Sequence, residues 1–362
     1  MQLSHNQESL LSLVRLGIGH ESYFLSKDVD WTFIKALAME QGLSAVVLNG
    51  LDKLDTKDKA LTRALPVALK LEWIGEVLQN YEQRYAAYEK AIGSLAAFYN
   101  QHGYKMMVLK GYTCSLDWAK PEHRPCGDID IWLFGQWKEA DKALSKEKGI
   151  KIDKAHHHHT VFEWNRFTVE NHYDFVNVYI HKKDRDLEDV FKEMGADDSH
   201  TVKVANETVY LPSPNLNALY LMKHMVNHFT GENVTLRQVL DWGFFVKNHS
   251  KEINWTWLEN MLRNHHMMAF YNCINAICVG DLGFNVMLFP KVQFDPMLKD
   301  LVLADILSSD YGEEPRGLIK RIVFKYRRWK GNQWKYKMCY DESGWTLFWR
   351  GLWNHLLKPA SI

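Results

Sequence analysis

The sequence is poor in cysteine, and its cysteines form no recognisable cluster. The five are Cys114, Cys126, Cys273, Cys278 and Cys339, among 362 residues. Their odd number argues against a disulfide framework, and the lack of any Cys-x-x-Cys pair argues against a zinc ribbon. Both absences favour reduced thiols, and therefore a cytoplasmic protein.

The sequence also lacks an excess of charge of either sign and any long apolar run. Lys and Arg together number 44, as do Asp and Glu. No field of the whole molecule therefore draws it to nucleic acid or to an anionic membrane, and such a contact would need a local patch. No run approaches the roughly 18 apolar residues of a membrane span, and residues 1–7 lack the basic and apolar parts of a secretion signal. Neither secretion nor a membrane span is predicted.

The residues that are present predict a large core. Hydrophobic residues make up 46% of the chain and aromatic residues 13%, enough for two or three subdomains. Apolar residues at helical spacing predict one helix over 31–42 and a long amphipathic helix over 71–95. The expected parts are a helical region 1–100, an α/β core 101–211, a helical domain 212–290 and a basic, aromatic tail 291–362.

The most informative stretch is Gly127-Asp128-Ile129-Asp130-Ile131. Strand side chains alternate, so Asp128 and Asp130 share one face while the two isoleucines point into a core. Two carboxylates so close together repel each other unless a cation lies between them, and hard oxygen ligands suit Mg²⁺. The pattern predicts a metal-dependent phosphoryl or nucleotidyl transfer site. A pair of surface aspartates at a strand end is the alternative.

A candidate anion site precedes this strand. Residues 105–109 are typical of a buried strand, Gly111 breaks the run, and residues 112–118 can form a helix. At such a turn the backbone can approach a phosphate, the first helical N–H groups donate to it, and Lys110 adds a positive charge. Lys-Gly is a common dipeptide, so it is evidence for an anion site only together with the acidic strand that follows.

Further strands are expected at 150–154, 158–164 and 167–175. In the last of these, Glu170 and His172 share one face, and Asn171 points to the other. Glu170 is therefore a candidate third carboxylate. A solvent-facing strand glutamate is the alternative.

These residues together carry a resemblance. In chain order they are Leu109-Lys110-Gly111, Arg124, Gly127-Asp128-Ile129-Asp130 and Glu170-Asn171-His172-Tyr173. This order resembles the DNA polymerase β type nucleotidyltransferase superfamily, and more closely a bacterial group of uncharacterised nucleotidyltransferases. The similarity runs from the predicted helix at 31–48 to about Phe284. It implies an α+β fold, a polymerase-β-like mixed sheet with helical N-terminal and C-terminal regions.

The resemblance also implies an NTP donor, two Mg²⁺ ions and a role for each matching residue. Asp128, Asp130 and Glu170 would hold the metals, and Glu170 would help to deprotonate an acceptor hydroxyl. The residues expected to bind nucleotide are Lys110, Gly111, Arg124, His172 and Lys223.

The implied enzyme would move NMP from the NTP to a small molecule, an RNA or a protein. The superfamily usually has Gly or Ser where this chain has Tyr112. That departure keeps an alternative open, a catalytically inactive protein of the same fold that binds nucleotide as a regulator or scaffold.

The run His156-His157-His158-His159 suggests a metal site. Alternation along a strand lets at most two of these imidazoles point the same way, and a first-row metal needs a further ligand. A histidine cluster at the surface or at the rim of the active site is therefore favoured over a dedicated zinc site.

Polar side chains recur at helical spacing after residue 212. Lys223, Asn227 and His228 form a stripe that faces either the catalytic cleft or solvent. Arg237 and Asp241 are four residues apart, which favours a structural salt bridge over a substrate contact.

The tail is basic and rich in aromatic residues. From Arg316 to Lys358, Lys and Arg outnumber Asp and Glu and alternate with aromatic residues. Such a segment can bind RNA or an anionic membrane surface, or it can form helices whose tryptophans pack on the domain. With zero overall charge, packing is favoured.

Overall fold

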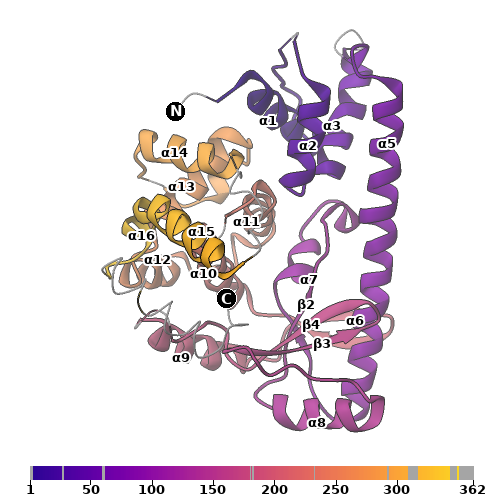
Figure 1. Ribbon diagram of the computed structural model, residues 1–362, viewed down its shortest axis with the longest axis vertical. Helices are drawn as coiled ribbons and strands as arrows, with labels where there is room; N and C mark the ends of the chain where they lie inside the picture. Colours follow the sequence, from indigo (N-terminus) through magenta and orange to yellow (C-terminus); the bar gives the residue numbers. More distant parts are fainter. Residues whose placement is uncertain are drawn as a thin grey trace.

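The molecule contains a six-stranded mixed sheet, which lies beside α6 in the lower part of Figure 1. The computed structural model describes residues 3–26, 28–58, 62–179, 181, 183–231, 233–291, 293–308, 317–342 and 349. Three aromatic residues of the predicted tail, Trp345, Phe348 and Trp353, lie outside the described residues. The predicted α+β class with a mixed sheet is confirmed.

The chain before the sheet is helical, as predicted. Its helices are α1 (His5–Gly17), α2 (Trp31–Glu40), α3 (Ser44–Lys57), α5 (Val67–Val77) and α6 (Arg84–Gln101). The π-helical segment η1 (Leu78–Gln83) joins α5 to α6. The result is one helix of about 50 Å along one side of the molecule (Figure 1). The long helix predicted over 71–95 is thus confirmed.

The strand order of the sheet is β3-β4-β2-β1-β6-β5. The strands are β1 (Met107–Val108), β2 (Ile129–Trp132), β3 (His159–Trp164), β4 (Phe167–His172), β5 (Thr201–Val204) and β6 (Glu207–Tyr210). β2 is parallel to β4 and antiparallel to β1. The strand predicted at 150–154 is wrong. Ile150 and Ile152 pack partly against the core, but within this segment only Asp153 pairs with a strand, in a single bridge with Val161.

The two faces of the sheet carry different side chains. On one face Ile129, Ile131 and Val169 pack with α6 and with α8 (Trp137–Lys148). Asn171 belongs to this face, where its amide donates to Asp141 of α8 at 2.8 Å. The opposite face carries Asp130 and Glu170 toward the helices that follow the sheet. Strand alternation therefore separates an apolar face from an acidic one, as the sequence predicted.

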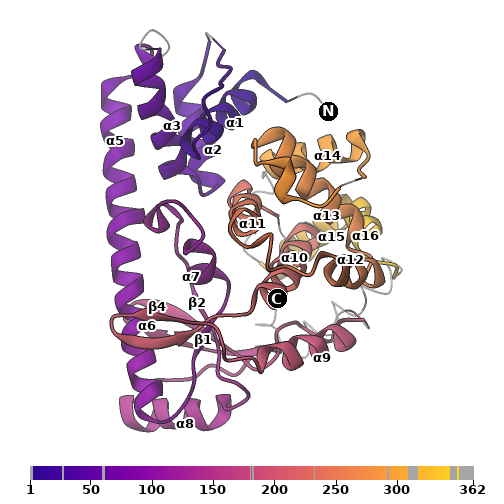
Figure 2. The ribbon, with the colours of Figure 1, turned by 180° about the vertical axis from the view of Figure 1, so that it is seen from behind.

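A second group of helices comes from the segment between β4 and β5 and from the chain after β6 (Figure 2). They are α9 (Asp184–Gly195), α10 (Pro214–Gly231), α11 (Leu236–His249), α12 (Trp255–Asn264), α13 (Met268–Ala276), α14 (Pro296–Leu307), α15 (Leu318–Gly331) and α16 (Gln333–Cys339). The short helix α7 (Lys110–Ser115) follows β1. One core of buried side chains extends from α1 through α16. The division into four parts stays a prediction.

The described part of the tail both packs and remains exposed. In α16, Trp334 packs on Phe229 with a centroid distance of 5.4 Å, and Lys335 is fully buried with its ammonium 2.6 Å from Asp305. Tyr326 and Trp349 remain largely exposed. Packing thus accounts for α16 but not for these two aromatic side chains.

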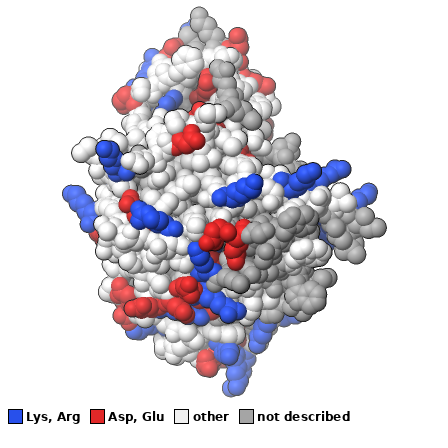
Figure 3. Space-filling model, turned by 90° about the vertical axis from the view of Figure 1, so that its left-hand side faces the viewer, with Lys and Arg blue, Asp and Glu red and all other residues white. Residues whose placement is uncertain are grey.

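Charge is interspersed over the face seen in Figure 3, where Lys and Arg alternate with Asp and Glu. All five cysteines are free thiols. Among the helices that the structure describes, none has the length and apolar composition needed to cross a lipid bilayer.

Candidate active site

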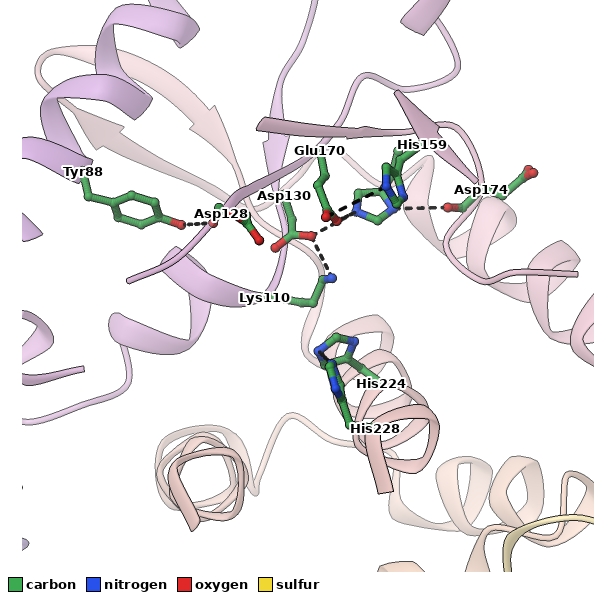
Figure 4. Close-up of polar contacts among 10 residues, drawn as sticks. Tyr88, Lys110, Asp128, Asp130, His159, Glu170, Asp174, His224 and His228 are labelled. Atoms are coloured by element: carbon green, nitrogen blue, oxygen red, sulfur yellow. Dashed lines mark hydrogen bonds and ion pairs between the residues drawn. The ribbon is translucent and has the colours of Figure 1, made fainter. Parts of the chain in front are cut away.

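Three carboxylates meet at one end of the parallel pair β2 and β4. Asp130 on β2 stands opposite Glu170 on β4 in the strand register, and Asp128 directly precedes β2. The three side chains point toward one another (Figure 4). Burial raises the pKa of Asp128, and the negative charges of Glu170 and Asp130 raise it further. This mutual repulsion is what a bound cation would relieve.

Asp130 is buried and doubly paired. Its Oδ1 lies 2.7 Å from the Lys110 ammonium and 3.0 Å from Nε2 of His172. Burial alone would raise the pKa of Asp130, but Lys110 and His172 more than offset this and hold it well below its ordinary value. Asp130 is therefore a carboxylate that stays ionised inside the protein.

His172 and Glu170 complete this pairing. His172 Nε2 also lies 3.5 Å from Glu170 Oε2. Burial lowers the pKa of His172, but its hydrogen bonds to Asp130 and Glu170 outweigh burial and raise it above its ordinary value. Burial raises the pKa of Glu170, and the His172 bond with the Lys110 charge brings it below its ordinary value. Ion pairs and hydrogen bonds among Asp130, Glu170, His172 and Lys110 thus hold the cluster together.

Lys110 begins α7 with a strained backbone, since its φ is 29°. Burial lowers the pKa of its ammonium, but Asp130, Tyr220 and Glu170 raise it to a value above the ordinary one. The ammonium also lies 6.0 Å from the centre of the Tyr220 ring on α10. Lys110 is therefore a charged group inside the carboxylate cluster, joining the sheet to α10.

Gly111 is required by a close contact. A Cβ at this position would lie 2.8 Å from the hydroxyl oxygen of Tyr88, which donates to the carbonyl oxygen of Asp128 at 2.8 Å. Sequence reasoning missed Tyr88, because its position in the apolar stripe of α6 is typical of core packing. Tyr112 is buried on the α6 side of the sheet and donates to Glu89 at 3.1 Å. Its side chain therefore does not enter the carboxylate cluster.

Arg124 lies near the cluster but is committed to another partner. Its guanidinium donates twice to Asp241, at 2.8 and 2.9 Å, and Trp118 donates to the same carboxylate at 2.9 Å. Arg124 and Lys110 line one interior cavity of about 40 Å³, which suits water rather than a phosphate chain. The structural ion pair predicted for Asp241 exists, but its partner is Arg124 rather than Arg237.

Lys223 also has a buried partner. Its ammonium lies 2.7 Å from Asp184 of α9 and 5.3 Å from the centre of the Tyr340 ring. Its side chain is only 2% exposed, so a solvated helix face is wrong for this residue. The nucleotide-binding roles predicted for Lys223 and Arg124 stay predictions.

The side of α10 toward Lys110 carries His224 and His228 instead (Figure 4). Their Nε2 atoms lie 3.1 Å apart. Burial lowers the pKa of His224, and the Lys110 charge lowers it further, so His224 is neutral. Sequence reasoning missed His224. Its spacing of four residues from His228 was the signal, because residues i and i+4 share a helix face.

The histidine run lies beside the carboxylates rather than on the surface. His157 and His159 are buried, and His159 Nε2 is 3.9 Å from Glu170 Oε1. Burial lowers the pKa of His158, and it lowers that of His159 to about 4. Residues 156–158 form a bend before β3, so strand alternation does not separate their side chains as predicted.

The donor groups fit metal binding. One ligand atom from each of Asp130, Glu170 and His172 lies within 4.8 Å of the others. The carboxylate oxygens of this group, with those of Asp128, are donors that Mg²⁺ prefers. The arrangement can hold a divalent cation at the acidic end of the sheet.

Comparison with known proteins gives one match. A family model described as "Uncharacterised nucleotidyltransferase" matches residues 27–279. No curated protein and no solved structure matches the chain significantly. The matched range includes all six strands, the three carboxylates and helices α2 to α13.

Proposed function

The chain belongs to the family of uncharacterised nucleotidyltransferases, and from this premise we propose that it transfers NMP from an NTP to an acceptor hydroxyl with Mg²⁺ as cofactor. The observation that carries the proposal is the convergence of Asp128, Asp130 and Glu170 at one end of β2 and β4. Three neighbouring carboxylates repel one another in the absence of a cation, and together they can bind a metal ion that catalyses phosphoryl chemistry.

The proposed roles follow from the charge of each side chain. Asp128, Asp130 and Glu170 would hold the metal, which on binding supplies positive charge to the phosphoryl oxygens. Glu170 is partly exposed and its pKa lies below the ordinary value, so its carboxylate is ionised at neutral pH. An ionised, accessible carboxylate can accept the proton of the acceptor hydroxyl.

Lys110 and His172 have the charge to position the donor. The Lys110 ammonium is already within the cluster, 2.7 Å from Asp130. We assign to it the contact with the β- and γ-phosphates, with the backbone of Gly111 beside it. His172 holds Asp130 in place through its 3.0 Å contact. Arg124 and Lys223 are weaker candidates for nucleotide contact, because Asp241 and Asp184 already neutralise them.

The test is turnover of each of the four NTPs, labelled at the α-phosphate, in the presence of a cell extract. The expected result is Mg²⁺-dependent release of pyrophosphate with transfer of label to an acceptor, both lost in Asp128→Asn. Sensitivity of the labelled product to ribonuclease or to protease assigns the acceptor to RNA or protein, and resistance to both assigns it to small molecules. Equal turnover by wild type and Asp128→Asn would overturn the proposal.

The buried ion pair of Lys110 with Asp130 favours a second candidate function. Lys110 and His172 already neutralise Asp130, so the cluster is electrostatically satisfied in part without any ion. A regulator or scaffold of the same fold would bind nucleotide and not turn it over. In that case an NTP raises the free energy of unfolding, on the order of 2–3 kcal/mol at a hundredfold excess over Kd, while no extract fraction accepts label.

A further inference from the structure

Three imidazoles from two neighbouring strands come together beside the carboxylates. His159 on β3 stands opposite His172 on β4 in the strand register, and His158 directly precedes β3. The ring centroids lie 4.3 Å apart for His158 and His159, 5.2 Å for His159 and His172, and 5.6 Å for His158 and His172. One ring nitrogen of each lies within 4.8 Å of those of the other two. The segment at β3 supplies two imidazoles, and the neighbouring strand β4 supplies the third, His172.

Two of these imidazoles, His158 and His159, have unused hydrogen-bonding capacity, whereas the His172 ring contacts Asp130 through Nε2 and the carbonyl oxygen of Asp174 through Nδ1, at 3.4 Å. His159 is 6% exposed and His172 is 2% exposed. The Nδ1 atoms of His158 and His159 are buried and have no hydrogen-bond partner in the described part of the chain. A buried polar atom without a partner costs about 1–3 kcal/mol. Two such atoms in one cluster favour a bound ligand that accepts the lone pairs of the ring nitrogens.

The surroundings favour a cation as that ligand. Glu170 Oε1 lies 3.9 Å from His159 Nε2, and Asp130 Oδ1 lies 3.0 Å from His172 Nε2. Asp128 adds a third carboxylate, and the Lys110 ammonium and the His172 ring pair with Asp130 rather than with Asp128. Carboxylates next to a histidine ligand are also the partners that orient imidazoles in metal sites.

We propose that His158, His159 and His172 bind one divalent transition-metal ion, with Zn²⁺ as the ion that the ligands suit. Imidazole nitrogens favour Zn²⁺ and its neighbours in the first row, whereas Mg²⁺ takes oxygen ligands. Three histidines leave a fourth tetrahedral position, for which the Glu170 carboxylate, 3.9 Å from His159 Nε2 and 3.5 Å from His172 Nε2, is a candidate. This site is therefore chemically distinct from the Mg²⁺ site of the proposed function.

His172 belongs to both groups of ligands. It contacts Asp130 and Glu170, and it is also the third imidazole. Occupation of the histidine site thus acts on a side chain that holds Asp130 in place. The site does not require nucleotidyl transfer, so it stands or falls separately from the proposed function.

The experiment titrates full-length protein, purified without a histidine tag, with Co²⁺ and then displaces it with Zn²⁺. The visible absorption of Co²⁺ reports nitrogen ligands in tetrahedral geometry. One Co²⁺ per chain, displaced by one Zn²⁺, is expected. His158→Gln and His159→Gln should each weaken binding by at least about 100-fold, the upper end of the loss from an outer-shell partner.

Two variants serve as matched controls. His156→Gln changes the neighbouring histidine, which stacks on His159 at 4.5 Å but is not in the group of three. Asp128→Asn changes the carboxylate cluster alone. Both should keep the tetrahedral Co²⁺ absorption of wild type. Equal binding by all variants, or loss only in Asp128→Asn, would overturn the proposal.

X-ray absorption at the zinc edge of the wild-type protein provides a measurement that needs no variant. Scattering from three imidazole rings is the expected result. Coordination by oxygen atoms alone contradicts the proposal, and so does failure of wild type to retain zinc after dialysis.

Discussion

Two buried charge clusters of this protein both pair carboxylates with basic side chains but differ in how completely their polar atoms are paired. In the helical cluster, Arg124 donates twice to Asp241, which also accepts from Trp118. In the sheet cluster, Asp128, Asp130 and Glu170 share Lys110 and His172. The helical cluster pairs Asp241 with Arg124, and the charge of Arg237 lies beside this pair. The sheet cluster has more negative charge than its partners neutralise.

This difference separates a structural role from a chemical one. A buried pair that uses all its hydrogen bonds has nothing left for a ligand, and its loss costs stability. A cluster with repelling carboxylates and unpartnered imidazole nitrogens stores unfavourable energy that a cation can release. We therefore expect substitutions in the sheet cluster to change binding and chemistry, and those in the helical cluster to change stability.

The largest expected effect is on nucleotide transfer by Asp128→Asn. The Asp128 carboxylate is repelled by its neighbours, so loss of its charge leaves stability unchanged or slightly raised. Loss of one metal ligand lowers turnover on the order of a thousandfold. Labelled NTP turnover and urea unfolding measure the two quantities. If Asp128→Asn keeps its turnover, or unfolds at a much lower urea concentration, the sheet cluster does not differ in role from the helical cluster.

Arg124→Met tests the helical cluster. It leaves the Asp241 carboxylate buried without its cation, which costs about 3–5 kcal/mol in the free energy of unfolding. Urea unfolding measures this. In a double-mutant cycle, Asp241→Asn combined with Arg124→Met should recover much of the loss, since it removes the uncompensated charge. If Arg124→Met instead keeps its stability and loses NTP binding, Arg124 is a nucleotide ligand as the sequence predicted.

Glu188 is an intermediate case, a buried carboxylate on α9 that accepts two backbone N–H groups and lies 3.5 Å from the Lys192 ammonium. Phe175 and Val176 donate to it at 3.1 and 2.9 Å. Burial raises its pKa to about 7 from an ordinary 4.5. Because the folded-state pKa is raised, its stabilising contribution is present below pH 4.5 and is lost as pH rises through about 7.

Glu188→Gln should therefore remove a pH-dependent part of the free energy of unfolding, on the order of 3 kcal/mol over this window. Urea unfolding at a series of pH values measures it. Glu193→Gln, an exposed substitution on the same helix, is the control. An equally steep pH dependence in Glu188→Gln and wild type would show that Glu188 titrates normally.

The smallest expected effect is steric. Gly111→Ala places a Cβ 2.8 Å from the Tyr88 hydroxyl, and such overpacking costs about 1–3 kcal/mol in the free energy of unfolding. Tyr88→Phe removes the hydroxyl and should offset part of this cost in the double variant. Thermal unfolding of the four proteins measures the coupling. Purely additive effects would mean that Gly111 is required for another reason.

Local periodicity predicted much of the sheet. The alternation of Asp128 and Asp130 with apolar residues placed both carboxylates on one face, and the spacing of Glu170 placed it on a later strand. β4 begins at Phe167, as predicted, and ends at His172, a few residues before the predicted end. These features depend on backbone geometry within a few residues, which sequence patterns record directly.

The partners of the charged residues could not be predicted in the same way. Arg124 and Asp241 are 117 residues apart, and Arg237 was the nearer choice in sequence. The meeting of His158 and His159 with His172 depends on the register of β3 against β4. The prediction for the histidine run at residues 156–159 considered one strand alone.

The sequence by itself determined the acidic face of β2 and the family, because period-two alternation and motif order are local properties. Only the tertiary structure decided that Lys110 pairs with Asp130, that Arg124 pairs with Asp241, and that three imidazoles share one site. The physical reason is that buried charges and ring nitrogens take the partners that packing brings within hydrogen-bond reach. Those partners come from segments far apart in the chain.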